Sequence, residues 1–546
     1  MLIPIRRVLL SVTDKTDLIP LARALARHGA ELISTGGTRA VLAEAGLTVR
    51  EISEITGKPE AFGGRMKTLS FEVASALLFD RDRDAAEAAK LGIEPIDCVV
   101  VNLYPFEKKR DEGVSDEILV ENIDIGGPTL LRAAAKNHRY VTVLSDPSQY
   151  AAVISELGAS GGSTSLSTRA RLARAAYNRT ADYDSAVAME LDRRAGTRSL
   201  RLSYGDPLQL RYGENSHQSA TLFRQRGVDK SLCDMVVMGG KQLSYNNLVD
   251  LEAALGAVKD LTRPGVAIVK HTNPCGLAAA DSARHAFELA WAGDPVSAFG
   301  AVIAFNRRVE LDVVRFLDFD AEPPPLRRQD ASATATQLKS LRKFVEILAA
   351  PEFSPEAVEY LHKHKDLRIV VIDPKKVAAT RDLRFLTGAV LDQDADVELL
   401  ARSEVVTRVA PKETDEELVR FGLAAVRSVK SNAIVLVRRK DGAFQLVGMG
   451  SGQPNRLNSV RLAVEKAREN LRQEGRTDEG VFEEIGRALM VSDAFFPFPD
   501  GIEVAAEAGV RCVYQPGGSI RDKAVIERCD QLGVVMVFTG LRHFKH

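Results

Sequence analysis

A lysine and a histidine stand side by side where an apolar run ends, in "VAIVKHTNPCG" at residues 266–276. A neutral imidazole can accept a proton near pH 7, and a neighbouring ammonium can stabilise negative charge that develops on a carbonyl oxygen. Pro274 and Gly276 follow at once and predict a stiff turn. Lys270 and His271 are therefore candidates for acid–base chemistry on a carbonyl compound. The alternative is a strand-end lysine in solvent beside a histidine packed in the core.

Two loops in the first part of the chain have the composition of anion-binding sites. "SVTDKT" (residues 11–16) and "STGGT" (residues 34–38) each follow a β-rich run. Both are expected at the carboxyl ends of parallel strands, where ligands bind. The glycines of the second loop let backbone amides approach an anion at a helix N-terminus, and Lys15 adds a cation. Either loop alone is more simply a glycine turn and a helix cap, but together they favour a phosphate or carboxylate site.

Titratable side chains occur in three later segments of the first part. "GGRMKT" places Arg65 and Lys67 two residues apart, and "NLYPF" places Tyr104 just past an apolar run. "NIDIGGPTLLRAAAKN" supplies Asp124 and Lys136 on either side of a helix start. In one pocket these groups would be general acids and bases with shifted pKa values. The alternatives are a solvated basic turn and a tyrosine packed at the sheet edge.

The second part of the chain holds further polar and aromatic candidates. "SDAFFPFPDG" places Asp493 and Asp500 around Phe495 and Phe496. An aromatic loop between carboxylates suits a flat heterocyclic cofactor, although such a loop is more often simple packing. The other candidate positions in this part are Arg211, Tyr212, His217, Asn246, Asn247, Asp250, Phe299, Gly300, Asn432 and Arg456.

Several chemistries are not expected from this sequence. It contains no GxxxxGK[ST] loop, the usual ATP signature. "GMGSGQPN" has the glycines of a dinucleotide loop, but a proline follows and no acidic residue is suitably placed, so a turn is expected. "NPCG" resembles the Pro-Cys of zinc deaminases, but Ala278 stands where the second cysteine should be and no H-x-E precedes it. We therefore expect no catalytic metal.

Two domains must position these residues. In the first part, β-rich runs alternate with helical spacing, as in "RVLLSV", "TDLIPLARALARHGA" and "ELIST". This order predicts a parallel sheet with helices on its faces. Small and polar residues break the pattern near Arg198, so we predict domains at residues 1–197 and 198–546. The second domain alternates likewise and could hold two similar subdomains. Residues 319–337, rich in proline and charge, predict an exposed insertion, with a linker between subdomains as the alternative.

Composition limits the classes of partner and compartment. The chain has 546 residues, with 73 Lys and Arg against 74 Asp and Glu, and this balance suggests neither a nucleic-acid nor a membrane-surface footprint. Its five cysteines form no disulfide or metal framework. The N-terminus lacks a signal-peptide layout, and no apolar run reaches spanning length. A cytoplasmic protein is therefore expected.

The ordered motifs together resemble one family. They are "SVTDKT", "STGGT", "GGRMKT", "NLYPF", "ENIDIGGPTLLRAAAKNH", "LRYGENSHQ", "LSYNNLVDLEAA", "VKHTNPCG", "SAFG", "SDAFFPFPDG" and "LRHFKH". Nearly the whole chain thus resembles the bifunctional enzymes of purine synthesis that join AICAR transformylase to IMP cyclohydrolase. The resemblance implies an α/β fold with a methylglyoxal-synthase-like parallel-sheet first domain. It also implies a transformylase of two cytidine-deaminase-like α/β subdomains, and a homodimer.

The resemblance also implies residue roles in formyl transfer. His271 would deprotonate the 5-amino group of AICAR as it attacks 10-formyltetrahydrofolate, the co-substrate, while Lys270 stabilises the oxyanion. Arg456 and Asp500 resemble folate contacts. The residues that resemble AICAR contacts are Arg211, Tyr212, Gly300, Glu346, Asn432, Phe495, Ser519, Ile520 and Arg542. The resemblance allows a bound monovalent cation but does not assign its ligands.

For ring closure, the resemblance makes Lys136 the proton donor and acceptor, assisted by Lys67, Tyr104 and Asp124. No external cofactor is needed, because the reaction is intramolecular. The residues that resemble the cyclohydrolase substrate site are Thr13, Asp14, Lys15, Thr35, Gly36, Gly37, Thr38, Arg65, Met66, Thr68, Val101, Asn102 and Ile125.

Two segments depart from the family pattern, both in the first domain. After Leu69 the chain has "SFEVASALL" where the family usually has a histidine-containing run, and "YNRTADYD" around Asn178 lacks another histidine. One alternative is therefore an active transformylase with a degenerate first domain. Another is a nucleotide-sensing module, since anion loops alone also fit an allosteric sensor. The acid–base set Lys67, Tyr104, Asp124 and Lys136 favours chemistry.

Overall fold

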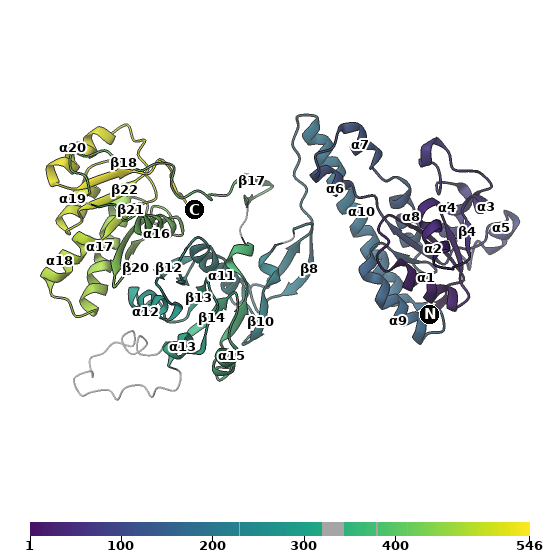
Figure 1. The fold of residues 1–546 in the computed structure, drawn as a ribbon, viewed down its shortest axis with the longest axis horizontal. Coiled ribbons are helices and arrows are strands. Elements are labelled where there is room, and N and C mark those ends of the chain that lie inside the picture. The colour runs from purple at the N-terminus through teal and green to yellow at the C-terminus, as the bar shows by residue number, and fades with distance from the viewer. Residues whose placement is uncertain (229, 319–342, 378–379, 412) are drawn as a thin grey trace. The chain divides into compact units, whose positions relative to one another are not determined.

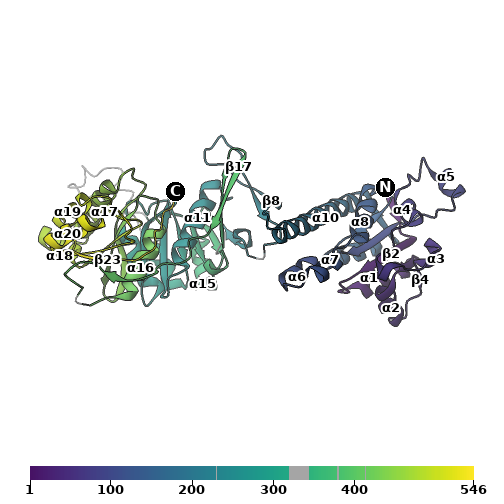
Figure 2. The ribbon, with the colours of Figure 1, turned by 90° about the horizontal axis from the view of Figure 1, so that it is seen from above.

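The computed structural model describes residues 1–228, 230–318, 343–377, 380–411 and 413–546. The described chain divides into two compact units, unit 1 (Met1–Ser203) and unit 2 (Tyr204–His546), which are coloured purple to blue and teal to yellow in Figures 1 and 2. The sequence placed the division after residue 197, a few residues earlier. The predicted proline-rich insertion at residues 319–337 lies outside the described residues.

Unit 1 is built on a parallel sheet with strand order β4-β3-β2-β5-β6. These strands are β2 (Arg7–Val12), β3 (Glu31–Ser34), β4 (Val49–Glu51), β5 (Cys98–Asn102) and β6 (Thr142–Leu144). The central strands β2 and β5 are nearly continuous apolar runs and are almost wholly buried, as expected for parallel strands with both faces covered. A short antiparallel pair, β1 (Leu2–Pro4) with β7 (Ser163–Ser165), lies outside this sheet.

Helices connect and cover the strands of unit 1. Helix α1 packs against α9, while α8 packs against α4, α10 and strand β5. The predicted α/β fold with a parallel first-domain sheet is confirmed. The helices are α1 (Leu18–Arg27), α2 (Gly36–Glu44), α3 (Ser53–Thr56), α4 (Phe71–Leu78), α5 (Ala85–Lys90), α6 (Phe106–Asp111), α7 (Asp116–Glu121), α8 (Gly126–Lys136), α9 (Tyr150–Ala159) and α10 (Leu166–Arg194).

Unit 2 repeats one strand arrangement in two halves. In the first half, β11 (Gly265–Lys270) pairs antiparallel with β12 (Asn273–Ala279) and β13 (Ala301–Phe305), and β13, β14 (Val345–Ala350) and β15 (Arg368–Val371) run parallel. In the second half, β19 (Ile434–Lys440) pairs antiparallel with β20 (Ala443–Gly450) and β21 (Leu489–Ser492), and β21, β22 (Cys512–Gln515) and β23 (Val535–Phe538) run parallel. The two similar subdomains of the prediction are thus present.

The two halves join into one sheet of twelve strands within the described part of unit 2. The junction is the antiparallel pairing of β12 with β20, where Ala278 faces Gln445 and Ala279 faces Phe444. The strands β10 (Val236–Gly239) and β18 (Glu404–Val405) lie at the two edges. Two separate hairpins, β8 (Tyr204–Gln209) with β9 (Thr221–Gln225) and β16 (Arg381–Leu386) with β17 (Ala389–Asp394), lie outside the sheet.

Equivalent helices cover the sheet of unit 2. The helices that precede β11 and β19, α11 (Tyr245–Val258) and α16 (Glu416–Arg427), share one apolar core with Ala267, Val269 and Val435. The helices α12 (Ala283–Gly293) and α17 (Arg456–Gln473) cover the alternate side chains of the same strands, as the two-residue period of a strand requires. The remaining α-helices are α13 (Leu311–Val314), α15 (Pro355–Leu361), α18 (Asp478–Arg487), α19 (Asp500–Glu507) and α20 (Asp522–Leu532).

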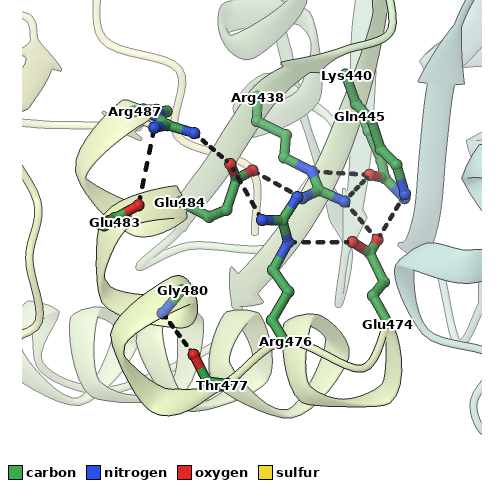
Figure 3. A network of polar contacts seen from close by, with 10 residues as sticks. All are labelled: Arg438, Lys440, Gln445, Glu474, Arg476, Thr477, Gly480, Glu483, Glu484 and Arg487. Atoms are coloured by element: carbon green, nitrogen blue, oxygen red, sulfur yellow. Dashed lines mark hydrogen bonds and ion pairs between the residues drawn. The ribbon is translucent and has the colours of Figure 1, made fainter.

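A buried ion-pair network fixes the turn between α17 and α18 onto the sheet (Figure 3). The guanidinium of Arg438, on β19, donates to Gln445 Oε1 over 3.0 and 2.8 Å, to Glu484 Oε2 over 3.0 Å, and to Glu474. Gln445 in turn donates to the carbonyl of Leu289 on α12, over 2.8 Å. One buried cation therefore ties the second half of the sheet to α17, α18 and the first half.

Candidate active sites

The carboxyl ends of β2 and β5 are joined in unit 1 by an asparagine. The backbone N–H groups of Thr13 and Asp14 donate to Asn102 Oδ1 over 2.6 and 2.9 Å, and Asn102 Nδ2 donates to the carbonyl of Asp14 over 2.9 Å. Asn102 thus holds the loop after β2 beside the end of β5, and Val101 precedes it on that strand. A hydrogen bond from the hydroxyl of Thr16 lowers the pKa of Asp14.

The second anion loop lies against the first. Lys15 Nζ donates to Thr38 Oγ1 over 3.1 Å and to the carbonyl of Val12, and Thr38 Oγ1 donates to that carbonyl over 3.0 Å. Ser11 and Thr35 bring their hydroxyl oxygens to 3.5 Å. Burial lowers the pKa of Lys15. The loops after β2 and β3 therefore gather one ammonium and the N-terminus of α2, at Gly36 and Gly37, as an anion site would require.

A half-buried carboxylate closes the same edge of the sheet at the start of α8. Asp124 accepts from Gly127 N over 2.7 Å and from Tyr104 N over 3.3 Å. Burial raises the pKa of Asp124, and these hydrogen bonds offset part of that rise. A Cβ added to Gly127 would lie 2.4 Å from Asp124 Oδ2, so only glycine lets the carboxylate come this close. The predicted pair Tyr104 and Asp124 is thus brought together.

Tyr183 supports this loop, although nothing in the sequence singled it out. Its hydroxyl accepts from Asp124 N over 2.8 Å and donates to the carbonyl of Asn122 over 3.1 Å. Tyr183 belongs to "YNRTADYD", one of the two segments that depart from the family pattern. In the other segment, Ser70 caps α4 by accepting from Val73 N over 3.2 Å. Both departures therefore leave well-formed local structure around the site.

The remaining candidates of unit 1 differ in their contacts and exposure. Thr68 lies against the start of α8, since a Cβ added to Gly126 would come within 3.1 Å of Thr68 Oγ1. Lys67 is 3.2 Å from Glu60, Arg65 pairs with Glu121, and Met66 and Ile125 are exposed.

Lys136 lies at the C-terminal end of α8, whereas Asp124 precedes its N-terminal end. It is exposed in the last turn of α8, which places it about 15 Å of helix rise from Gly126. The sequence predicted Lys136 about two turns into this helix, and its role in proton exchange stays a prediction.

In unit 2, Lys270 and His271 line a cavity of about 250 Å³ at the junction of the two halves. Lys270 Nζ donates to the carbonyl of Phe299 over 2.7 Å, which fixes the ammonium next to Gly300. The wall comes from β12, β20 and the ends of α12 and α17, and its residues are Asn273, Cys275, Gly293, Asp294, Ser297, Leu446, Val447, Gly448, Met449, Ser451, Lys466 and Asn470. The pair thus faces a cleft, as acid–base chemistry requires.

The position of the turn corrects the sequence prediction. Proline and glycine were expected to form the bend, but His271 and Thr272 form it, with φ values of 54° and 64°. Residues Asn273–Ala279 continue as strand β12, and Pro274 lies where the register of β11 and β12 shifts. Proline is tolerated there because a bulge breaks the ladder of hydrogen bonds. The imidazole is therefore carried by the bend itself.

Arg456 and Asn432 form a buried polar cluster. Arg456 Nη1 donates to Ser492 Oγ over 2.8 Å and to Asp493, and Arg456 Nη2 donates to Asn432 Oδ1 over 2.8 Å. Arg456 is only 7% exposed. Arg456, which was predicted to contact the folate, thus already binds side chains of its own chain. The cluster adjoins the hairpin, because Lys430 N donates to Asn273 Oδ1 over 3.0 Å.

The structure also describes the other predicted nucleotide and folate residues. Glu346 is held by Arg368 Nη1 over 2.5 Å, and Gly300 N donates to the carbonyl of Phe344 over 2.8 Å. The guanidinium of Arg211 lies 5.4 Å from the ring of Tyr212, and that of Arg542 lies 4.6 Å from the ring of Phe544. Phe495 and Ser519 are half-buried, whereas Ile520 and Asp500 are exposed.

Sequence reasoning missed an ion pair in the cavity wall. Lys466 Nζ lies 3.1 Å from Asp294 Oδ2, and Ser297 donates to Asp294 from both its backbone N–H and its hydroxyl. Burial alone would lower the pKa of Lys466, but the charge of Asp294 and hydrogen bonds raise it overall. The two partners come from α17 and the end of α12, so no local pattern could have paired them.

Metal and membrane features can be assessed for the part of the chain that the structure describes. There, no group of three or more His, Cys, Asp and Glu side chains is placed to hold a metal ion. Among the same residues, no helix has both the length and the apolar character needed to span a bilayer.

Comparisons with known proteins identify the family. The family model described as "AICARFT/IMPCHase bienzyme" matches residues 134–321 and 326–466, and that of the "MGS-like domain" matches residues 17–129. Three relatives carry the name "Bifunctional purine biosynthesis protein PurH". They come from Persephonella marina (40% identical, covering 99% of this chain and 100% of the relative), Magnetococcus marinus (42%, 99% and 99%) and Sorangium cellulosum (41%, 99% and 100%). The chain therefore belongs to the AICARFT/IMPCHase bienzyme family.

Proposed function

We propose that this chain catalyses the last two steps of IMP synthesis, formyl transfer to AICAR and ring closure of formyl-AICAR. Its family is described as a bienzyme, and its relatives align over nearly their whole length. These matches favour two activities over a transformylase with a degenerate or sensing first domain. The observation that carries the residue assignment is that Lys270 and His271 line one cavity.

We assign formyl transfer to that cavity. The amino nitrogen of AICAR attacks the formyl carbon of the folate donor, and His271 accepts the proton that this nitrogen loses. Lys270, held by the Phe299 carbonyl, stabilises charge on the formyl oxygen. The bond between the formyl carbon and the folate nitrogen then breaks, and that nitrogen takes up a proton. The family supports a folate co-substrate, and we propose its 10-formyl form.

The nucleotide and folate contacts remain proposals of the same kind. For AICAR they are Arg211, Tyr212, Gly300, Glu346, Asn432, Phe495, Ser519, Ile520 and Arg542. Asp500 is proposed as a folate contact because it is exposed beside the aromatic loop. Arg456 is better suited to hold Asn432 in place, because its guanidinium is buried against Asn432, Ser492 and Asp493.

We assign ring closure to the loop cluster of unit 1. The carboxamide nitrogen of formyl-AICAR attacks its own formyl carbon, and the hydroxyl that forms there leaves as water. Lys15 and the α2 N-terminus would hold the phosphate, while Lys67, Tyr104 and Asp124 exchange the protons. Lys136, in the last turn of α8, is proposed as the proton donor and acceptor that these three residues assist.

We also propose a homodimer in the cytoplasm. The β16–β17 hairpin exposes Phe385, Leu386 and Leu391, of which Phe385 is 66% exposed. Apolar side chains gathered on a projecting hairpin suit burial against a second copy. Sedimentation of the purified chain tests this, and Phe385→Asp is expected to shift it towards the monomer. A monomeric wild-type chain would contradict the proposal.

The role of His271 is tested by substitution. His271→Ala is expected to abolish formyl transfer, measured as folate product, while AICAR still binds in equilibrium dialysis. His362→Ala, an exposed histidine at the end of α15, serves as the matched control and should retain wild-type turnover. Normal transfer by His271→Ala would refute the proposed base.

A further inference from the structure

The β11–β12 hairpin, whose turn carries His271, has an equivalent in the second half of unit 2. The β11–β12 turn lies between the paired residues Lys270 and Asn273, and the β19–β20 turn lies between Lys440 and Ala443. Both turns have two central residues with positive φ, 54° and 64° in the first and 50° and 80° in the second. This is the backbone of a type I′ hairpin turn.

The two turns differ in the residues that adopt this backbone. The second uses Asp441 and Gly442, a pair that favours the conformation, whereas the first uses His271 and Thr272. Histidine tolerates positive φ better than most residues, but a β-branched side chain there is an outlier. Such strain persists only where the surroundings hold it in place. The first turn therefore needs a restraint that the Asp441–Gly442 turn does not need.

Asp250 on helix α11 supplies contacts of that kind. Its Oδ1 accepts from Thr272 N over 2.7 Å. Burial raises the pKa of Asp250, while its interactions with the backbone of Thr272 and with His271 and Lys270 offset part of that rise. Helix α11 packs directly on β11, β12 and β13. The carboxylate is therefore fixed relative to the sheet that ends in the turn.

We propose that Asp250 is a positioning residue for formyl transfer, which clamps the strained turn so that the imidazole of His271 is held at the cavity. The inference rests on the proposed role of His271 as the base. Asp250 forms and breaks no bond in the reaction, and it acts only through its hold on the backbone of the turn. Asn273 assists from the other side, since its Nδ2 donates to the carbonyl of His271 over 3.0 Å.

The clamp makes a specific prediction about rescue. Asp250→Ala is expected to lower kcat for formyl transfer at least tenfold, with KM for AICAR changed less than threefold. Thr272→Gly alone should keep turnover within threefold of the wild type, because the intact clamp still holds the turn. In the double variant Asp250→Ala/Thr272→Gly, glycine removes the strain, so most of the lost kcat should return. A double variant no faster than Asp250→Ala would overturn the proposal, since a group acting directly on substrate cannot be replaced by a glycine elsewhere.

The equivalent turn provides a matched control. Gly442→Thr places the same β-branched residue at the same backbone position, where an added Cβ meets no atom within 4 Å. It should lower the Tm and leave kcat unchanged, and an equal loss of kcat would show that any strained hairpin impairs the enzyme. Conversion of formyl-AICAR to IMP by unit 1 should stay constant in every variant. If His271→Ala turned over normally, the proposed base would fail, whereas normal turnover by Asp250→Ala alone would overturn only the clamp.

Discussion

Removal of the buried cation in the Arg438 network should cost much of the stability of unit 2. In Arg438→Met the apolar stem is kept, but Glu474 and Glu484 lose the more buried of the two guanidinium groups that pair with both, and their side chains are only 16% and 11% exposed. Breaking a buried pair by removing one partner costs about 3–5 kcal/mol. The hydrogen bond to Gln445 adds about 1 kcal/mol. Lys440, Arg476 and Arg487 still pair with these glutamates, so we expect the free energy of unfolding to fall by about 4 kcal/mol, the lower limit of the two costs together.

Arg487→Met is the matched control for this substitution. Arg487 binds the same carboxylate, at 3.0 Å from Glu484 Oε1, but its side chain is 70% exposed. Exposed ion pairs contribute about 0–1 kcal/mol, so the control should be nearly silent. Both variants can be followed by urea unfolding with the fluorescence of Trp291, the single tryptophan of the chain. Trp291 lies on α12, which Gln445 links to the network through the Leu289 carbonyl.

The pH dependence adds a second test of the same reasoning. Burial alone would raise the pKa of Glu484, but the hydrogen bond from Arg438 and the charges of Arg476 and Arg438 hold it below its usual value. The stability from this carboxylate is thus present above its unfolded pKa and is lost as pH falls through the folded one. Without Arg438 the carboxylate is easier to protonate, so the gap between variant and wild type should narrow near pH 4. The reasoning would be refuted if Arg438→Met lost less than about 1 kcal/mol of unfolding free energy, or if its difference from the wild type grew in acid.

Three further predictions concern the two sites. Asp124→Asn should lower the rate of IMP formation from formyl-AICAR at least tenfold, yet keep or raise the Tm at pH 7. Burial raises the pKa of this carboxyl, so its ionised form destabilises the fold above that pKa. A lower Tm of the variant would contradict this explanation. Lys270→Met should lower kcat for formyl transfer by about 10²–10³ with IMP formation from formyl-AICAR unchanged, and a loss of both would argue against separate sites. Incubation with EDTA should leave both rates unchanged, and a loss that Zn²⁺ restores would reveal a metal that we do not expect.

The sequence was most informative where local rules govern the structure. Apolar runs such as Arg7–Val12 and Cys98–Asn102 predicted buried parallel strands, and the structure confirms them. "STGGT" predicted a strand followed by a helix N-terminus, which Gly36–Glu44 provides. These features depend on neighbouring residues alone, so composition and spacing are enough to predict them.

Features set by distant partners were beyond sequence reasoning. Pro274 and Gly276 suggested the bend, but pairing with β13 and the bulge at Pro274 moved it to His271 and Thr272. Arg456 was assigned to the folate, yet Asn432 and Asp493 reach it from other elements and bury it. Such tertiary contacts join residues that no local window contains.

The most direct test of the two-activity assignment is a two-step assay on the purified chain. AICAR and 10-formyltetrahydrofolate are supplied, and formyl-AICAR and IMP are quantified separately over time. We expect a transient rise of formyl-AICAR followed by IMP, and His271→Ala should form neither product while still closing added formyl-AICAR to IMP. Accumulation of formyl-AICAR without any IMP in the wild-type chain would contradict the two-activity assignment.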